Sequence, residues 1–392
     1  MKITAIKTYK FSVPTSQQVH DPHTGQMLAS AFKNWLFLKI ETDAGITGWG
    51  EGSGEWLVPS VEATLNEWSV LLVDRDPLPV MAVCQDILDR LPWKGGPVLG
   101  TAMAAINAAL YDIAGKAWGV PVHNILGGKC RDRVRIYTGG RYSTPQEAAE
   151  DAQNKLQLGY EAMKGNPLET RRWPMDDAAV DHSVACIAAI RQVVPSHFDI
   201  LLDTHGSPTP ELSVEFSRRV APHRPLFLEE PVKFGSLDAL EEVSRKSPVP
   251  VATGEKLFTF EQFKPMIDRR SCAFLQPDII HCYGISTYLK IAAYAEHQQM
   301  LMAPHLGGGP LSWIVSIQSD AVTPNFLIQE THGFEVFKKY VEHDMVIENG
   351  HVNVPDRPGL GVEVKEADIA KLPYQQMAYR QYRHEDGSWK GW

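Results

Sequence analysis

The chain has 392 residues, more than one ordinary domain needs, and its 44% hydrophobic and 22% charged content is that of a globular protein with a sizeable core. A formal net charge of −9 without a basic stripe of Lys and Arg argues against nucleic acid as a partner, although it leaves a small anionic substrate open. The five cysteines are scattered and never form Cys-x-x-Cys, which argues against disulfides and structural zinc.

The amino terminus alternates like a strand and lacks the apolar stretch of a signal peptide. No run elsewhere approaches the length and apolarity of a membrane span. We therefore expect a cytoplasmic protein without a membrane partner.

The first third of the chain predicts an α+β domain over residues 1–130. Residues 1 to about 55 show strand patterns, and the stretch from about 59 to 119 is helical, most clearly from Thr101 to Ala117. Strands followed by helices indicate an α+β unit rather than a barrel. Gly127 and Gly128 then provide a natural hinge.

From Val134 to about 345, short apolar strands alternate with amphipathic helices. This alternation predicts a parallel (β/α) barrel over residues 131–345. The segment 353–361 is too rich in Pro and Gly for a barrel helix, so residues 346–392 form a separate tail.

Three acidic residues recur at one interval within the barrel. Asp203, Glu229 and Glu255 are each 26 residues apart, about the length of one strand, one helix and their loops. A single acid at a strand end could be a solvated rim residue or a helix N-cap, but equal spacing of all three favours a shared site. Glu230 should point to the opposite face from Glu229. Converging carboxylates repel one another without a cation, and an all-oxygen shell suits Mg²⁺.

Further polar residues follow at similar spacing along the sequence. Each comes after a short apolar run, as expected at the carboxyl end of a buried parallel strand. They are Lys164, Asp278, His305 and Glu330. An isolated histidine is more often a hydrogen-bonded structural residue. If the two strands are adjacent, however, Asp278 could bind one ring nitrogen of His305 and raise the basicity of the other.

Two pairs of residues have the i, i+2 relation that places side chains on one face of a strand. Asn166 follows Lys164 in this way, and His205 follows the first acid of the triad. His205 could coordinate a metal, but a Mg²⁺ site prefers oxygen, so we favour a proton donor. His281 and His332 are interpreted as surface or loop residues without a role.

In this order the motifs resemble the mandelate racemase branch of the enolase superfamily. The matching motifs are the Lys164 motif, Asp203, Glu229-Glu-Pro, Gly-Glu255, Pro-Asp278, Pro-His305 and the late Glu330. The pair Asp203-x-His205 with Lys164-Gly-Asn166 is most similar to D-galactonate dehydratases and related acid-sugar dehydratases. The match covers nearly the whole chain.

The resemblance implies an α/β fold, a modified TIM (β/α) barrel with an α+β capping domain built from the amino-terminal region and the carboxyl-terminal tail. It implies Mg²⁺ on the three acids and His305, oriented by Asp278, as the base that removes the proton alpha to a carboxylate. Glu330 and Lys164 would complement the developing charge. His205 would protonate the departing 3-hydroxyl, which gives a 2-keto-3-deoxy acid.

Dehydration is favoured over racemisation because a racemase needs a base on each face of the carbanion, and Asn166 cannot serve as the second base. Alternatives are an acid-sugar epimerase or lactone cycloisomerase that uses His205 as a second base, or a catalytically silent regulatory or binding barrel. D-galactonate, or a related hexonate or pentonate such as L-lyxonate, is the expected substrate. His20 and Trp56 of the capping domain are expected to contact it, together with Lys164 and Asn166. The resemblance also implies a homo-oligomer, an octamer.

Overall fold

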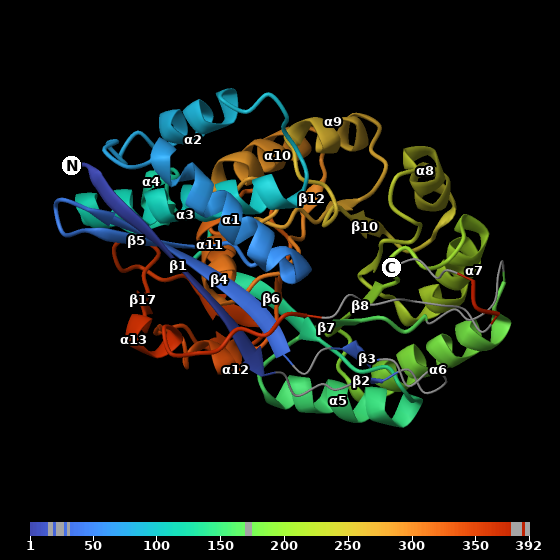
Figure 1. Ribbon diagram of the computed structural model, residues 1–392. Coiled ribbons are helices and arrows are strands. Elements are labelled where there is room, and N and C mark those ends of the chain that lie inside the picture. The colour runs from blue at the N-terminus through green and yellow to red at the C-terminus, as the bar shows by residue number, and fades with distance from the viewer. Residues whose placement is uncertain (15–18, 21–26, 30–31, 169–174, 378–385, 389–392) are drawn as a thin grey trace.

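The computed structural model describes residues 1–14, 32–168, 175–377 and 386–388, and the backbone alone at 19–20 and 27–29. It contains an antiparallel sheet with helices and, beside it, a barrel of parallel strands, shown in Figure 1 in blue to teal and in green to orange. The expected fold class is therefore confirmed. The domain boundaries at 130 and 345 stay predictions.

The capping domain is built on a sheet of order β1-β4-β5. Gly48 and Gly50 on β5 face helix α3, and a Cβ on either would lie about 2 Å from the carbonyl oxygen of Ala109 or Ala105. Small residues on both elements therefore allow this helix to pack directly on the sheet. The elements are β1 (Ile3–Pro14), β2 (Val19–His20), β3 (Met27–Ala29), β4 (Phe32–Thr42), β5 (Thr47–Glu51), η1 (Glu55–Leu57), α1 (Val58–Trp68), η2 (Ser69–Leu71), α2 (Val80–Asp89), α3 (Pro97–Trp118) and α4 (Val122–Ile125).

Helix α3 corrects one expectation. By length and composition it could cross a membrane, so the sequence does contain a run that approaches a span. Of its most apolar window, 89% is buried inside the protein, as expected for a helix at the centre of a folded core.

Eight parallel strands form the barrel. β6 pairs with β7 on one side and with β13 on the other, and a bridge between Met302 and Phe326 links β12 to the segment before β13. Their inward side chains fill the interior, with large residues such as Tyr137 and Phe227 beside alanines. The strands are β6 (Arg133–Gly139), β7 (Ala162–Gly165), β8 (Asp199–Asp203), β9 (Phe227–Glu229), β10 (Val251–Thr253), β11 (Phe274–Leu275), β12 (Leu301–Met302) and β13 (Gln329–Thr331).

Helices between these strands cover the barrel, and α5 to α8 lie along its outer side in Figure 1. Their starts follow from local sequence: Thr144, Asp176, Thr209 and Ser236 each accept a backbone N–H at a helix N-terminus. The helices are α5 (Pro145–Gln157), α6 (Asp177–Val193), α7 (Pro210–Val220), η3 (Ala221–His223), α8 (Leu237–Lys246), α9 (Phe260–Asp268), α10 (Ile285–His297), α11 (Pro310–Asp320) and α12 (Phe334–Phe337).

The tail first extends the barrel and then returns to the capping domain. Strand β16 pairs antiparallel with β6. Farther along, the backbone N–H of Leu360 donates to Asp112 in α3, and Glu366 accepts from Lys39 in β4. Figure 1 shows β17 and α13 beside the blue strands. The elements are β14 (Val341–Glu342), β15 (Ile347–Glu348), β16 (His351–Asn353), β17 (Glu363–Val364) and α13 (Glu366–Ile369).

Candidate active site

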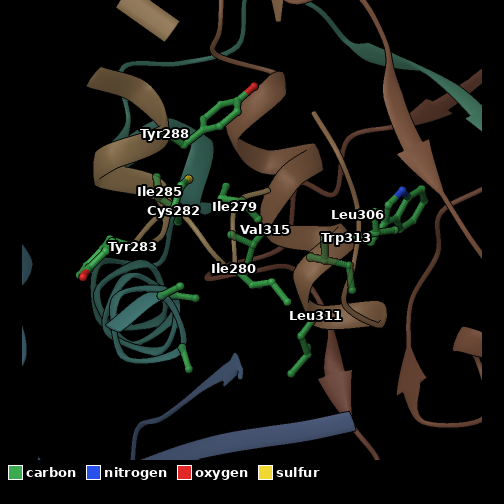
Figure 2. Close-up of a cluster of buried hydrophobic side chains, with 14 of the residues drawn as sticks. Ile279, Ile280, Cys282, Tyr283, Ile285, Tyr288, Leu306, Leu311, Trp313 and Val315 are labelled. Carbon is green, nitrogen blue, oxygen red and sulfur yellow. The ribbon is translucent and has the colours of Figure 1, made fainter. Parts of the chain in front are cut away.

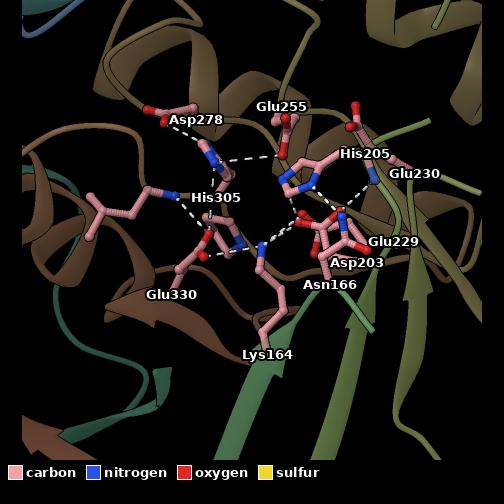
Figure 3. A network of polar contacts seen from close by, with 12 residues as sticks. Lys164, Asn166, Asp203, His205, Glu229, Glu230, Glu255, Asp278, His305 and Glu330 are labelled. Carbon is pink, nitrogen blue, oxygen red and sulfur yellow. Dashed lines mark hydrogen bonds and ion pairs between the residues drawn. The ribbon is translucent and has the colours of Figure 1, made fainter. Parts of the chain in front are cut away.

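The polar residues singled out in the sequence lie together at the carboxyl ends of the barrel strands (Figure 3). Asp203 and Glu229 are the last residues of β8 and β9 and are paired across them, while Lys164 lies on β7 and Glu330 on β13. The remaining three follow the ends of β10, β11 and β12 by two or three residues: Glu255, Asp278 and His305. Parallel strands end at one rim, which is why residues more than 160 positions apart meet.

Asp203, Glu229 and Glu255 form the described group of acids that could hold a metal ion. One carboxylate oxygen from each lies within 4.8 Å of the others, and all three side chains are buried. Burial and the charge of Asp203 raise the pKa of Glu229 well above its usual value.

Two buried oxygens, Oε2 of Glu229 and Oε2 of Glu255, have no hydrogen-bond partner among the described residues. Unsatisfied buried carboxylate oxygens are costly, so their convergence fits a hard, oxygen-preferring divalent cation such as Mg²⁺.

Lys164 lies at the centre of the acids. Its Nζ is 2.8 Å from Glu229 Oε1, 3.1 Å from Glu330 Oε1 and 3.5 Å from Asp203 Oδ2. Burial alone would lower the pKa of this lysine, but the charges of Glu229 and Glu330 outweigh it and raise the pKa well above its usual value. Lys164 is therefore a permanent positive charge beside the triad.

His305 and Asp278 form a hydrogen-bonded pair. His305 Nδ1 lies 2.8 Å from Asp278 Oδ2, and since a carboxylate only accepts, Nδ1 carries the proton. The other ring nitrogen, Nε2, is left 3.6 Å from Glu255 Oε2 and 4.0 Å from Glu330 Oε2. Burial lowers the pKa of His305, but the charge of Glu255 and the hydrogen bond to Asp278 outweigh it, and the net pKa is well above its usual value.

His205 contacts the triad from another direction than His305 (Figure 3). Its Nε2 is 3.2 Å from Asp203 Oδ2, and its Nδ1 lies 3.4 Å from the amide nitrogen of Asn166. Strand β8 ends at Asp203, and His205 has a left-handed φ of 48° that the inward-face argument did not foresee.

Three contacts in the site were missed in the sequence. His332 Nε2 lies 2.8 Å from Glu330 Oε1, a contact that its interpretation as a surface or loop residue did not include, and its lack of a role stays a prediction. The i, i+2 relation to Glu330 would have found it. His281 is buried beside Asp278, which also differs from a surface position. Glu230 is buried and forms an ion pair with Lys256.

The capping domain reaches the loop that carries His305. The buried carboxylate of Glu51 accepts backbone N–H groups of Gly309 and Ser312, 2.5 and 2.9 Å away. Trp56 is half-buried in the adjacent turn η1, and its substrate contact stays a prediction. The side chain of His20 lies outside the described residues.

Comparison with known proteins agrees with this architecture. Residues 6–127 match the model of the mandelate racemase / muconate lactonizing enzyme N-terminal domain, and residues 147–368 match the enolase C-terminal domain-like model. The chain is 34% identical to a D-galactonate dehydratase of Variovorax paradoxus, aligned over all of both chains.

Solved structures are similar over the same extent. An enolase from Agrobacterium radiobacter, a candidate galactarate dehydratase with bound sodium and L-malate, covers all of both chains with a TM-score of 0.89 at 25% identity. A mandelate racemase/muconate lactonizing enzyme from Sulfitobacter covers 96% of each chain with a TM-score of 0.85 at 28% identity. This chain therefore belongs to the mandelate racemase / muconate lactonizing enzyme family of the enolase superfamily.

Proposed function

We propose that this protein is an acid-sugar dehydratase, a carbon–oxygen lyase that removes water from an aldonate to give a 2-keto-3-deoxy acid. D-galactonate is the proposed substrate, because several relatives at 32–35% identity carry the name D-galactonate dehydratase. The observation that carries the proposal is the meeting of three features at one rim: a buried acid triad, a histidine oriented by Asp278 and a second histidine. Homo-oligomeric assembly and a cytoplasmic location stay predictions.

The proposed metal ligands are Asp203, Glu229 and Glu255. When bound there, Mg²⁺ would supply the positive charge that stabilises the substrate carboxylate and the enediolate formed from it. Enolase-superfamily sites generally use a Lys or His base with Mg²⁺, so this part of the proposal is family chemistry.

Proton transfer at C2 is assigned to His305. Asp278 holds its Nδ1–H, so in the neutral imidazole the lone pair of Nε2 is the base that takes the C2 proton, and the raised pKa of His305 makes this nitrogen a stronger base. Removal of the C2 proton increases the negative charge on the substrate carboxylate. The positive charge of Lys164, beside the acids, stabilises this added charge. Glu330 holds this lysine in place and accepts the backbone N–H of Leu306.

The second half of the reaction breaks the C3–O bond. The electron pair left at C2 forms the C2–C3 double bond, and the 3-hydroxyl departs as water with a proton from the imidazolium form of His205, which becomes neutral imidazole. The resulting enol takes a proton at C3 and becomes the 2-keto-3-deoxy acid. The proton that His305 took from C2 returns to solvent, so one water is lost in each turnover.

A screen of acid sugars with Mg²⁺ tests the function, with D-galactonate, L-lyxonate and other hexonates and pentonates as separate arms. We expect a semicarbazide-reactive keto acid from one of them, and its loss in EDTA. Deuterium at C2 of recovered substrate without any keto acid would instead indicate an epimerase. Absence of Mg²⁺-dependent chemistry across the whole set would overturn the proposal in favour of a binding barrel.

A further inference from the structure

His281 lies beside the pair of residues to which we assign proton abstraction. Its Nε2 is 3.9 Å from Asp278 Oδ2. That oxygen also lies 2.8 Å from His305 Nδ1 and 2.6 Å from the backbone nitrogen of Gly307. A Cβ on Gly307 would lie 3.2 Å from both Asp278 Oδ2 and His281 Nε2, so the three groups are packed without spare room.

The other ring nitrogen of His281 contacts the capping domain. Nδ1 lies 2.9 Å from the hydroxyl of Thr101, a fully buried residue in the second turn of α3. At the preceding position a Cβ on Gly100 would lie only 2.4 Å from the carbonyl oxygen of His281. Helix α3 therefore rests directly on this residue of the barrel.

The charge of Asp278 decides how His281 is protonated. A lone pair on Nε2 would face a carboxylate oxygen, whereas an Nε2–H bond presents positive charge to it, so the Nε2–H tautomer is favoured. Nδ1 is then an acceptor, and the Thr101 hydroxyl donates to it.

The backbone joins these side chains into one unit. The carbonyl of Asp278 accepts the N–H groups of His281 and Cys282, and its Oδ1 accepts the N–H of Ile280. Figure 2 shows the buried side chains of this turn with those of Leu306, Leu311, Trp313 and Val315, which follow His305. A shift of the turn would therefore move the Asp278 carboxylate relative to His305, because the next residue, Leu306, is held separately by Glu330.

We propose that His281 is a positioning residue. It contacts Thr101 of capping helix α3 on one side and Asp278 on the other, so the packing of α3 on the barrel sets the orientation of the Asp278–His305 pair. His281 is not a member of the acid triad, and its ion-pair partner among the described residues is Asp278. Its contribution is orientation: Asp278 Oδ2 stays directed at His305 Nδ1 only while α3 is docked. The inference rests on the proposed function only for its kinetic consequences.

The test replaces the hydroxyl and leaves both histidines in place. In Thr101→Val we expect kcat for the acid-sugar substrate to fall by about 10- to 100-fold, the usual effect of removing a group that orients a functional histidine. KM should change less than about twofold, because substrate contacts are intact. C2 exchange with solvent deuterium should fall by the same factor as kcat. Thr101→Ser keeps the hydroxyl and should restore both.

Thr64→Val is the matched control. Thr64 also lies on a capping-domain helix, but its hydroxyl donates an exposed hydrogen bond to Ser60 of the same helix. An unchanged kcat in Thr101→Val, or a loss that Thr101→Ser does not restore, would overturn the proposal. Crystals of Thr101→Val provide a readout that needs no substrate: the bond between Asp278 Oδ2 and His305 Nδ1 should lengthen or break. A bond that stays at its present length would overturn the proposal even if the protein acted on no acid sugar.

Discussion

Replacement of Lys164 by Met probes how the charges of the site are balanced. The lysine is the charged partner of buried Glu229, and it also contacts Glu330 and Asp203. Removal of one partner of a buried ion pair costs about 3–5 kcal/mol, because the other charge is left without compensation. For 392 residues that unfold in one transition, the unfolding entropy is about 0.8 kcal/mol per kelvin, so the metal-free Tm should fall by about 4–6 °C.

Mg²⁺ should reverse much of this loss. The variant site is more negative by one charge and should bind the cation more tightly, so saturating Mg²⁺ should raise its Tm more than that of the wild type. For scale, a ligand at 100 times its Kd stabilises by about 2.7 kcal/mol. The assay is thermal unfolding followed by circular dichroism, in EDTA and in a Mg²⁺ titration.

Lys246→Met serves as the control because it removes a lysine from an exposed ion pair with Glu242. Such pairs contribute about 0–1 kcal/mol, so its Tm should stay within about 1 °C of the wild type with or without Mg²⁺. A metal-free Lys164→Met protein as stable as this control, or a smaller Mg²⁺ shift than in the wild type, would refute the charge argument.

Three further results are expected. His305→Asn should abolish both turnover and exchange of the C2 proton with solvent. His205→Asn should block formation of the keto acid yet leave C2 exchange largely intact. Loss of exchange in His205→Asn would mean that the two roles are wrongly assigned. Burial raises the pKa of Glu51 to about 7, so the contribution of this group to wild-type stability should fall as pH rises from about 4.5 to about 7, by at most about 1.4 kcal/mol per pH unit. In urea unfolding, Glu51→Gln should flatten the dependence of the unfolding free energy on pH in this range. The same dependence in the variant and the wild type would contradict the raised pKa of Glu51. His332→Phe removes a hydrogen bond to Glu330 and should lower kcat by about 10-fold or more with little change in KM, whereas an unchanged kcat would make it a bystander.

Regular spacing in the sequence was sufficient to predict the acid triad. A (β/α) unit has a nearly constant length, and the register of parallel strands brings equivalent positions to one rim, so Asp203 and Glu229 pair as expected. The same logic applied at Glu330 predicts His332 on the same face, two residues later. That relation was present in the sequence and was overlooked.

The buried contacts of His281 were missed for a different reason. It follows Asp278 by three residues, within a turn, where neither strand nor helix periodicity fixes the direction of a side chain. Its partner Thr101 is 180 positions away, on a helix whose pattern indicates only that it is buried. A contact between two domains depends on how their surfaces dock, and no local pattern carries that information.

The charge of the site connects its stability with its chemistry. Four buried carboxylates, those of the triad and Glu330, surround one ammonium group, which gives a formal charge of −3 if all are ionised. The fold can reduce this charge by protonation, as the raised pKa of Glu229 indicates, or by binding a divalent cation. An anionic substrate can enter only in the second case, because protonation of Glu229 removes a ligand that would hold the metal. We therefore expect protons to compete with Mg²⁺, so that metal binding weakens as pH falls while metal-free stability improves. Isothermal titration with Mg²⁺ across pH measures the first trend, and affinity that does not change with pH would mean that the carboxylates are already ionised and that the cluster is held by Lys164 alone.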